Sequence, residues 1–317
     1  MSNRWCRPTI ISVSMTPPAP HSLIRLVAGA LFLCFFIVAG QSAEPKPPAD
    51  LGIELGAIPA GTFLMGSPDS EAWRNADPTS GEGPQTKVHI TKPFWMGKTE
   101  VTRGQYEALM GPMEDPWSKK TAEELKKSGV DFAQYPAVNV TWDQANEYCR
   151  KLTQRERAAG RLPAGLKYSL PTEAQWEYAC RAGTASRNYV SDSDDALTDI
   201  AWYVKTTGPF NRGNMPRIQP VGKKKPNAWG LYDMLGNARE WTLDWIGPYL
   251  GGEASDPCGS KDPVKANLAF RVQRGGAWID AKSKLRCAAR NWSDPAFGSQ
   301  NGFKEGTVGF RVAVVSE

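Results

Sequence analysis

Histidine is almost absent from this sequence, which has only His21 and His89 among its 317 residues. A metal site built from several histidines therefore has too few ligands. The chain also has no G-x-S-x-G nucleophile elbow, no P-loop and no H-E-x-x-H motif. These absences argue against an α/β-hydrolase, a P-loop NTPase and a zinc protease of the usual kinds.

A strong charge of either sign is missing too. Lys and Arg number 38 against 33 Asp and Glu, which gives a formal net charge of +5. Three of the arginines precede the first acidic residue, Glu44, and no stripe of basic residues follows it. We therefore expect no nucleic-acid partner.

The first 43 residues have the layout of a secretory signal peptide. Arginines precede an apolar run, Leu26–Val38, that is too short to span a bilayer comfortably, and small residues follow it. This pattern predicts a signal peptide at residues 1–43, cleaved between Gly40 and Glu44; the alternative is an uncleaved membrane anchor. Cleavage implies export to the periplasm, the cell surface or the medium, with no stable membrane span afterwards.

A Pro-rich linker, residues 44–50, follows the leader. No second linker and no internal repeat is seen beyond it, so residues 51–317 are predicted to form one domain. Loss of the leader removes two cysteines, Cys6 and Cys34. The four that remain are Cys149, Cys180, Cys258 and Cys287. An even number in an exported chain favours disulfides, and none of the four forms a C-x-x-C pair.

Capping boxes mark the starts of helices, because a Thr hydroxyl and a Gln or Glu three residues later satisfy backbone donors of the first turn. They occur at Thr121, Thr141 and Thr172, and Thr102 caps a shorter helix over residues 101–110. Apolar, turn-bounded segments predict strands at residues 58–65, 88–97 and 308–315. Between residue 187 and the last of these strands, little regular structure is predicted.

Several short motifs follow one another after the linker. They are Ile58–Gly66, Lys98–Thr102, Val138–Cys149, Leu170–Tyr178, Asn227–Trp241, Arg274–Trp278, Arg286–Arg290 and Gly309–Arg311. In this order they resemble the formylglycine-generating enzyme family, the sulfatase-modifying factors, over nearly all of residues 51–317. The resemblance implies a single, loop-rich α+β domain related to the C-type lectin fold.

The family's activity is also implied, but here the sequence departs from the pattern. Enzymes of the family use oxygen to oxidise a sulfatase cysteine to formylglycine, with two active-site cysteines that bind copper(I). Those positions are Asp280 and Lys282 here, and the neighbouring serine is Ala277. Because a carboxylate and an ammonium cannot replace two soft thiolates, neither copper nor classical oxidation is expected. Asp280 is expected to form a polar site or a simple ion pair with Arg286 or Arg290.

The resemblance further implies a disulfide between Cys180 and Cys287. The residue that would bond to Cys149 in the family is Val312 here. Cys149 therefore either bonds to Cys258 or stays a buried thiol, and both alternatives remain open.

A calcium site carries over from the resemblance as well. Its ligands would be the side chains of Asp233 and Glu240 and the backbone carbonyls of Gly236 and Ala238. Independently, two carboxylates seven residues apart on a turn containing Gly and Asn can surround a hard cation with oxygen atoms. The alternative is that Asp233 caps a turn and Glu240 makes a salt bridge.

The favoured hypothesis is an exported, non-classical family member that acts as a binding module. It would bind a peptide, a protein such as a sulfatase, or a glycan in the inherited cleft, because binding residues concentrate on loops carried by a rigid scaffold. The alternative is an enzyme that oxidises sulfatase cysteines, or runs another reaction, through an altered site around Asp280. A third possibility is a structural envelope protein stabilised by calcium.

Overall fold

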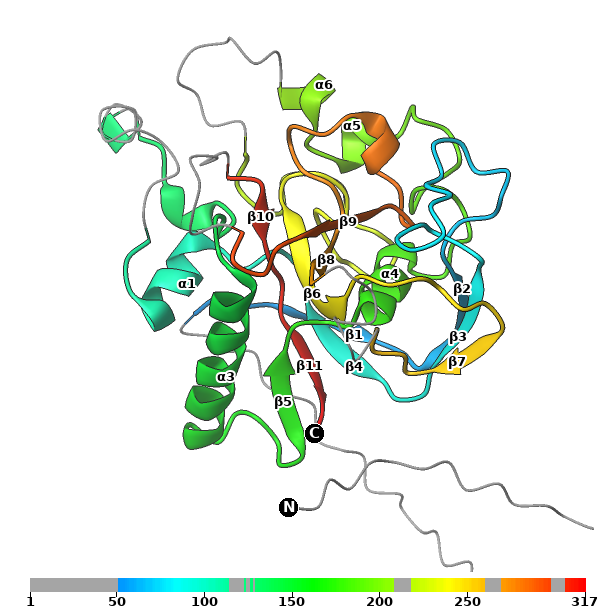
Figure 1. The fold of residues 1–317 in the computed structure, drawn as a ribbon. Coiled ribbons are helices and arrows are strands. Elements are labelled where there is room, and N and C mark those ends of the chain that lie inside the picture. Colours follow the sequence, from blue (N-terminus) through cyan, green and yellow to red (C-terminus); the bar gives the residue numbers. More distant parts are fainter. Residues whose placement is uncertain are drawn as a thin grey trace, which may run out of the picture. The chain divides into compact units, whose positions relative to one another are not determined.

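The computed structural model of the protein describes residues 51–113, 123, 126–127, 129–207, 218–259, 269–297 and 306–317. All of these belong to one compact unit, Ser42–Glu317. Its mixture of helices and strands confirms the α+β class (Figure 1). The predicted leader, the linker and most of the helix predicted from Thr121 lie outside the described residues. Within these ranges, no helix is both long and apolar enough to cross a membrane.

The capped helices begin where the sequence predicts them. They are α1 (Arg103–Met110), α3 (Trp142–Ala158) and α4 (Glu173–Arg181). In each, the hydroxyl of the N-cap threonine accepts a hydrogen bond from the backbone N–H three residues on, and that residue's Gln side chain accepts one from the threonine N–H. The shorter helical segments are α5 (Leu197–Ile200), α6 (Val204–Thr207) and two 3₁₀ turns, Phe132–Gln134 and Lys282–Lys284.

The first sheet brings together strands from both ends of the domain. Its order is β1 (Leu55–Ile58), β4 (Phe94–Gly97), β11 (Ala313–Ser316) and β5 (Leu166–Ser169). All neighbours in this sheet are antiparallel. Helix α3 lies beside β5 (Figure 1). Pairing of the central strands β4 and β11 therefore joins the early part of the domain to its C-terminal strand.

A second sheet shows that two predicted strands are wrong as continuous elements. Its order is β2 (Gly61–Met65), β3 (Thr86–Ile90) and β7 (Glu253–Ser255). The segment 58–65 divides into the end of β1 and all of β2, and the segment 88–97 divides into β3 and β4. Both divisions coincide with a proline, Pro59 or Pro93. Because proline has no N–H to give to a ladder, the chain changes sheets at these points.

The third sheet lies in the part of the chain for which little regular structure was predicted. Its order is β10 (Val308–Gly309), β6 (Arg239–Trp245), β8 (Arg271–Arg274) and β9 (Arg290–Ser293). Along β6, the alternate residues Glu240, Thr242 and Asp244 are all buried. A half-buried strand normally places its apolar residues inward, so these buried polar residues conceal the strand from pattern analysis.

The predicted terminal strand over residues 308–315 is also two elements. β10 joins the third sheet and β11 joins the first, with Arg311 between them. Arg311 is fully buried and forms a two-pronged ion pair with Glu240 on β6, with Nε–Oε2 at 2.6 Å and Nη2–Oε1 at 2.7 Å. The chain between the two strands thus carries a guanidinium into the core, where β6 supplies its counter-charge.

Further buried ion pairs connect the third sheet to α4. Arg274 Nη2 on β8 lies 2.5 Å from Glu177 Oε2, and Arg290 Nε on β9 lies 2.8 Å from Glu173 Oε1. All four side chains are buried. Removing one member of such a pair leaves an uncompensated buried charge, so these contacts hold α4 firmly against the sheet.

Candidate functional site

Asp280 and Lys282, which the motif spacing predicts at the family's two cysteine positions, lie after β8. Asp280 Oδ2 accepts a hydrogen bond from the Ala277 backbone N–H at 2.8 Å, which closes the turn. Arg239, the first residue of β6, donates to both carboxylate oxygens, at 2.6 Å from Nη2 to Oδ1 and 3.0 Å from Nε to Oδ2. Such two-pronged, charge-assisted contacts fix both position and charge. The first cysteine position therefore holds a carboxylate whose charge the chain itself neutralises.

The predicted pairing of Asp280 with Arg286 or Arg290 is wrong. Both arginines are buried in ion pairs elsewhere in the domain. The pairs are Arg286–Glu82 and Arg290–Glu173. The true partner, Arg239, lies 41 residues from Asp280 and begins a strand that the sequence did not predict. In the sequence, Arg239 could be noticed only as a member of the Asn227–Trp241 motif.

Lys282 is part of a partly exposed group of side chains. Its Nζ lies 2.7 Å from Asp194 Oδ2 and 5.0 Å from the centre of the Trp73 ring. Arg187 pairs with the same aspartate at 2.5 Å and lies 4.8 Å from the same ring. Trp73 is 44% exposed. We call these four residues, Trp73, Arg187, Asp194 and Lys282, the Trp73 cluster.

The donor chemistry at the two positions does not fit copper(I). A hard carboxylate and an ammonium stand where soft thiolates are needed. Within the ranges that the structure describes, no three His, Cys, Asp or Glu side chains gather in a way that could hold a metal ion.

The two cysteines of the predicted disulfide are neighbours in the core. Cys180 Sγ and Cys287 Sγ lie 3.5 Å apart as thiols, and both residues are fully buried. Burial raises the pKa of the Cys180 thiol well above its usual range, and the contact with Cys287 acts in the same direction. Bond formation between them stays a prediction. Cys149 is a buried thiol on α3, whereas Cys258 is exposed.

Of the predicted calcium ligands, Asp233, Gly236 and Ala238 precede β6 and Glu240 is the second residue of that strand. Gly236 has φ +84°, and a Cβ there would meet the Trp202 carbonyl oxygen at 2.3 Å, so the turn requires glycine. Glu240 does make a salt bridge, because both its oxygens accept from Arg311. Asp233 Oδ2 accepts from the Gly222 N–H at 2.7 Å, whereas its Oδ1 is buried without a hydrogen-bond partner.

Glu100 is a further acidic residue beside this turn that the sequence analysis did not single out. It is completely buried, and neither of its carboxylate oxygens has a hydrogen-bond partner. Burial, together with the charges of Asp233 and Glu240, raises its pKa well above the usual range. Burial likewise raises the pKa of Asp233 to about 6. The carboxylate oxygens without donors are therefore both oxygens of Glu100 and the Oδ1 of Asp233, whereas both Glu240 oxygens accept hydrogen bonds.

The fold is a loop-rich α+β domain, with the charged residues Asp280 and Lys282 in the turn after β8. The family model "Sulfatase-modifying factor enzyme 1-like domain" matches residues 42–315. The chain belongs to this family, as the motifs indicated.

Individual relatives agree with this assignment. The chain is 29% identical over 293 residues to the serine/threonine-protein kinase pkn1 of Chlamydia pneumoniae, a match that covers 87% of this chain but only 40% of that protein. It is 27% identical over 327 residues to the formylglycine-generating enzyme of Streptomyces coelicolor, covering 86% of this chain and 93% of that enzyme. Among solved structures, Treponema denticola variable protein 1 has a TM-score of 0.62 at 25% identity, covering 82% and 94% of the two chains.

Proposed function

We propose that this protein is an exported family member that does not oxidise cysteine and instead binds a peptide segment of a partner protein. The binding surface would consist of the Trp73 cluster and the adjacent turn at Asp280. The observation that carries the proposal is the two-pronged Arg239–Asp280 ion pair at the first cysteine position. It provides a rigid, neutralised surface and no group that could bind copper(I).

The composition of the Trp73 cluster supports a binding role. Exposed Trp and Arg side chains are typical of the residues that dominate binding energy at protein interfaces. Here Arg187 and Lys282 flank one indole ring within 5.0 Å of its centre. A peptide that places an aromatic or acidic side chain against this cluster would gain both apolar contact and charge pairing.

Absence of oxidation is tested with the purified protein, copper(I), air and a peptide carrying the sulfatase Cys-x-Pro-x-Arg motif. Mass spectrometry then follows conversion of the peptide cysteine to the aldehyde. The Streptomyces coelicolor enzyme in parallel is the positive control. We expect no aldehyde above the protein-free rate. Aldehyde formation above that rate would favour the enzyme alternative and contradict the proposal.

Peptide binding is tested with the same peptide after its cysteine is changed to serine and a fluorophore is attached. Fluorescence anisotropy measures its Kd for the parent protein and for Trp73→Ala. Loss of an aromatic anchor predicts binding weaker by roughly tenfold or more. Leu64→Ala, which removes another exposed apolar side chain, is the matched control and should not change the Kd. Equal binding by the parent and Trp73→Ala would contradict a role for the cluster.

We also propose that calcium stabilises the turn between Asp233 and Glu240. The buried Asp233 Oδ1 and the Glu100 carboxylate support this proposal because they lack donors, and carboxylate oxygens are ligands that calcium prefers. The test is the melting temperature of the protein with added calcium and with a chelator. We expect calcium to raise the melting temperature of the parent, and Asp233→Asn to reduce that rise. An identical melting temperature in both conditions would contradict the site.

A further inference from the structure

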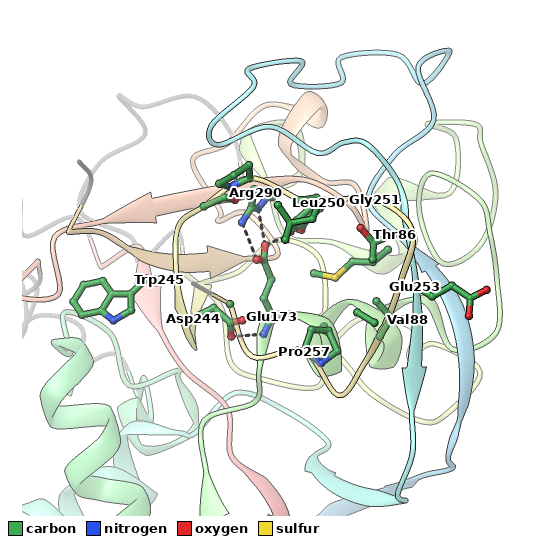
Figure 2. Close-up of a pocket in the computed structure, with 17 residues that line it drawn as sticks. Thr86, Val88, Glu173, Asp244, Trp245, Leu250, Gly251, Glu253, Pro257 and Arg290 are labelled. Atoms are coloured by element: carbon green, nitrogen blue, oxygen red, sulfur yellow. Dashed lines mark hydrogen bonds and ion pairs between the residues drawn. The ribbon is translucent and has the colours of Figure 1, made fainter. Parts of the chain in front are cut away.

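A cavity of about 360 Å³ lies away from the Asp280 turn, between the second sheet, the start of α4 and the chain that follows β6 (Figure 2). Its volume falls in the range of small-molecule sites. Most of its wall is apolar. The apolar side chains that line it include Met65, Val88, Ala174, Tyr249, Leu250 and Pro257. The cavity therefore favours a ligand with an apolar body.

One carboxylate oxygen in the wall receives no hydrogen bond from the described residues. Asp244 is only 3% exposed, and its Oδ2 accepts a hydrogen bond from the Glu173 backbone N–H at 2.7 Å (Figure 2). No residue of the described part of the chain donates a hydrogen bond to its Oδ1, and no described Lys or Arg forms an ion pair with it. A buried carboxylate is costly unless a cation or sufficient donors satisfy it.

The other charged groups that line the cavity are already matched. Arg290 donates to both oxygens of Glu173, at 2.8 Å and 2.9 Å, and the Tyr249 hydroxyl donates to the same carboxylate at 3.0 Å. Glu253 pairs with Lys87 at 2.8 Å, across the neighbouring strands β7 and β3 and exposed to solvent. Among the carboxylates that line the cavity, Asp244 is therefore the one that neither Arg290 nor Lys87 pairs with.

Arg271 does not take that role either. Its guanidinium lies between two indole rings, 3.6 Å from the centre of Trp142 and 3.5 Å from that of Trp245. Its Nη1 donates to the Leu243 carbonyl at 2.5 Å. The stacked arginine acts on Asp244 only at longer range. Burial, followed by the charge of Glu173, raises the pKa of Asp244 to about 7 despite the two arginines nearby.

We propose that this cavity binds a primary ammonium group carried on an apolar chain. The ammonium would donate a hydrogen bond to Asp244 Oδ1 and supply the missing counter-charge, while its alkyl stem packs against Met65, Val88 and Leu250. A long apolar stem ending in a compact cation matches a mostly apolar wall in which one carboxylate has no ion-pair partner among the described residues. Two sources share this chemistry, a lysine side chain of a polypeptide and a free alkylamine. The site is separate from the proposed peptide surface and does not depend on it.

The first test uses the unmodified protein at pH 8, where hexylamine is an ammonium and Asp244 is mainly ionised. Calorimetry compares hexylamine with hexan-1-ol, which has the same stem without the charge, and with methylamine, which has the charge without the stem. We expect hexylamine to bind roughly tenfold or more tightly than either. Equal binding of hexylamine and hexan-1-ol would overturn the proposal.

A second test changes the carboxylate. Asp244→Asn keeps an oxygen for the Glu173 N–H but removes the charge, so hexylamine should bind about tenfold or more weakly. Asp199→Asn, which removes an exposed carboxylate on α5, is the matched control and should bind as the parent does. Unchanged hexylamine binding by Asp244→Asn would overturn the site. If that variant does not fold, the comparison of hexylamine with hexan-1-ol on the unmodified protein still tests the proposal.

The source of the ammonium is distinguished with Nα-acetyl-lysine N-methylamide. Tighter binding of this compound than of hexylamine would support a lysine side chain of a polypeptide. Tighter binding of hexylamine would support a free alkylamine. Failure of both to bind would overturn the proposal, whatever the aldehyde and anisotropy assays show for the peptide surface.

Discussion

Asp280 and Asp244 are two carboxylates of one domain, and they differ in how completely the chain satisfies them. Asp280 has Arg239 on both oxygens and a backbone N–H at its turn. Asp244 has one backbone N–H, from Glu173, and no ion pair with a described residue. The difference teaches that a carboxylate with a two-pronged arginine partner is complete as a structural contact, whereas one without an ion pair among the described residues is the better candidate for binding a cationic ligand.

The largest effect is expected where a matched pair beside the cavity is broken. Arg290→Met removes the two-pronged partner of the buried Glu173 and leaves it only Arg274, 3.5 Å away, which should lower the free energy of unfolding by about 3 kcal/mol. Denaturant unfolding measures this loss. The double variant Arg290→Met/Glu173→Gln should recover part of it, because no unpaired charge remains. A single variant as stable as the parent would show that the pair is not a buried contact in solution.

The second prediction concerns the unmatched carboxylate. The pKa of Asp244 in the folded protein, about 7, lies above its ordinary value of 3.8. Between these values the folded state holds more protons than the unfolded state, so this group makes stability fall as pH rises from 4 to 7. Asp244→Asn should remove that fall and gain up to about 4 kcal/mol over the parent at pH 8, with little gain at pH 4.

Denaturant unfolding of the parent and Asp244→Asn at several pH values checks this expectation. Asp233 and Glu100 also have raised pKa values and act in the same direction, so only the difference between the two proteins isolates Asp244. A difference that does not vary with pH would mean that Asp244 is not a buried, unmatched acid.

A smaller effect is expected when Asp280 is turned into an unmatched carboxylate. Arg239→Met removes both donors, but the pair is partly exposed, so the loss should be about 1–2 kcal/mol. Arg239→Lys keeps the charge without the two-pronged geometry and should lose less. Thermal unfolding compares the three proteins. Equal melting temperatures for all of them would contradict a structural role for the Arg239–Asp280 contact.

The smallest effect is expected at the second cysteine position. Lys282 is 52% exposed and pairs with Asp194 at the surface. Surface pairs contribute little, so Lys282→Ala should change the free energy of unfolding by less than about 0.5 kcal/mol. The same unfolding measurement checks it. A loss as large as that of Arg239→Met would mean that the Trp73 cluster is part of the structural core.

The sequence predicted the helices well because their signals are local. A capping box spans four residues, and those at Thr141 and Thr172 mark the starts of α3 and α4. Strand limits were less accurate, since Pro59 and Pro93 interrupt apolar runs that otherwise look continuous. The third sheet was not predicted because Glu240 and Asp244 are polar residues that are buried. Their partners, Arg311 and the start of α4, are brought to them only by the tertiary fold.

The candidate site was predictable in part. The motif spacing singled out Asp280 and Lys282, whose side chains are not the soft ligands that copper(I) prefers, and the absence of copper stays a prediction. Their partners were not predictable, because Arg239 and Asp194 are brought to them by long-range packing. The cavity at Asp244 had no sequence signal at all, since its wall is assembled from segments between Met65 and Arg290.

The most direct test of the contrast is a titration with hexylamine followed by carboxyl ¹³C NMR of aspartate-labelled protein. We expect the Asp244 carboxyl resonance to shift as the ammonium binds. The Asp280 resonance should not shift, because the Asp280 carboxylate is already paired with Arg239. Assignment would rest on Asp244→Asn and Asp280→Asn. A shift of the Asp280 resonance with none at Asp244 would contradict binding at Asp244, since it would place the ammonium at the Asp280 turn instead.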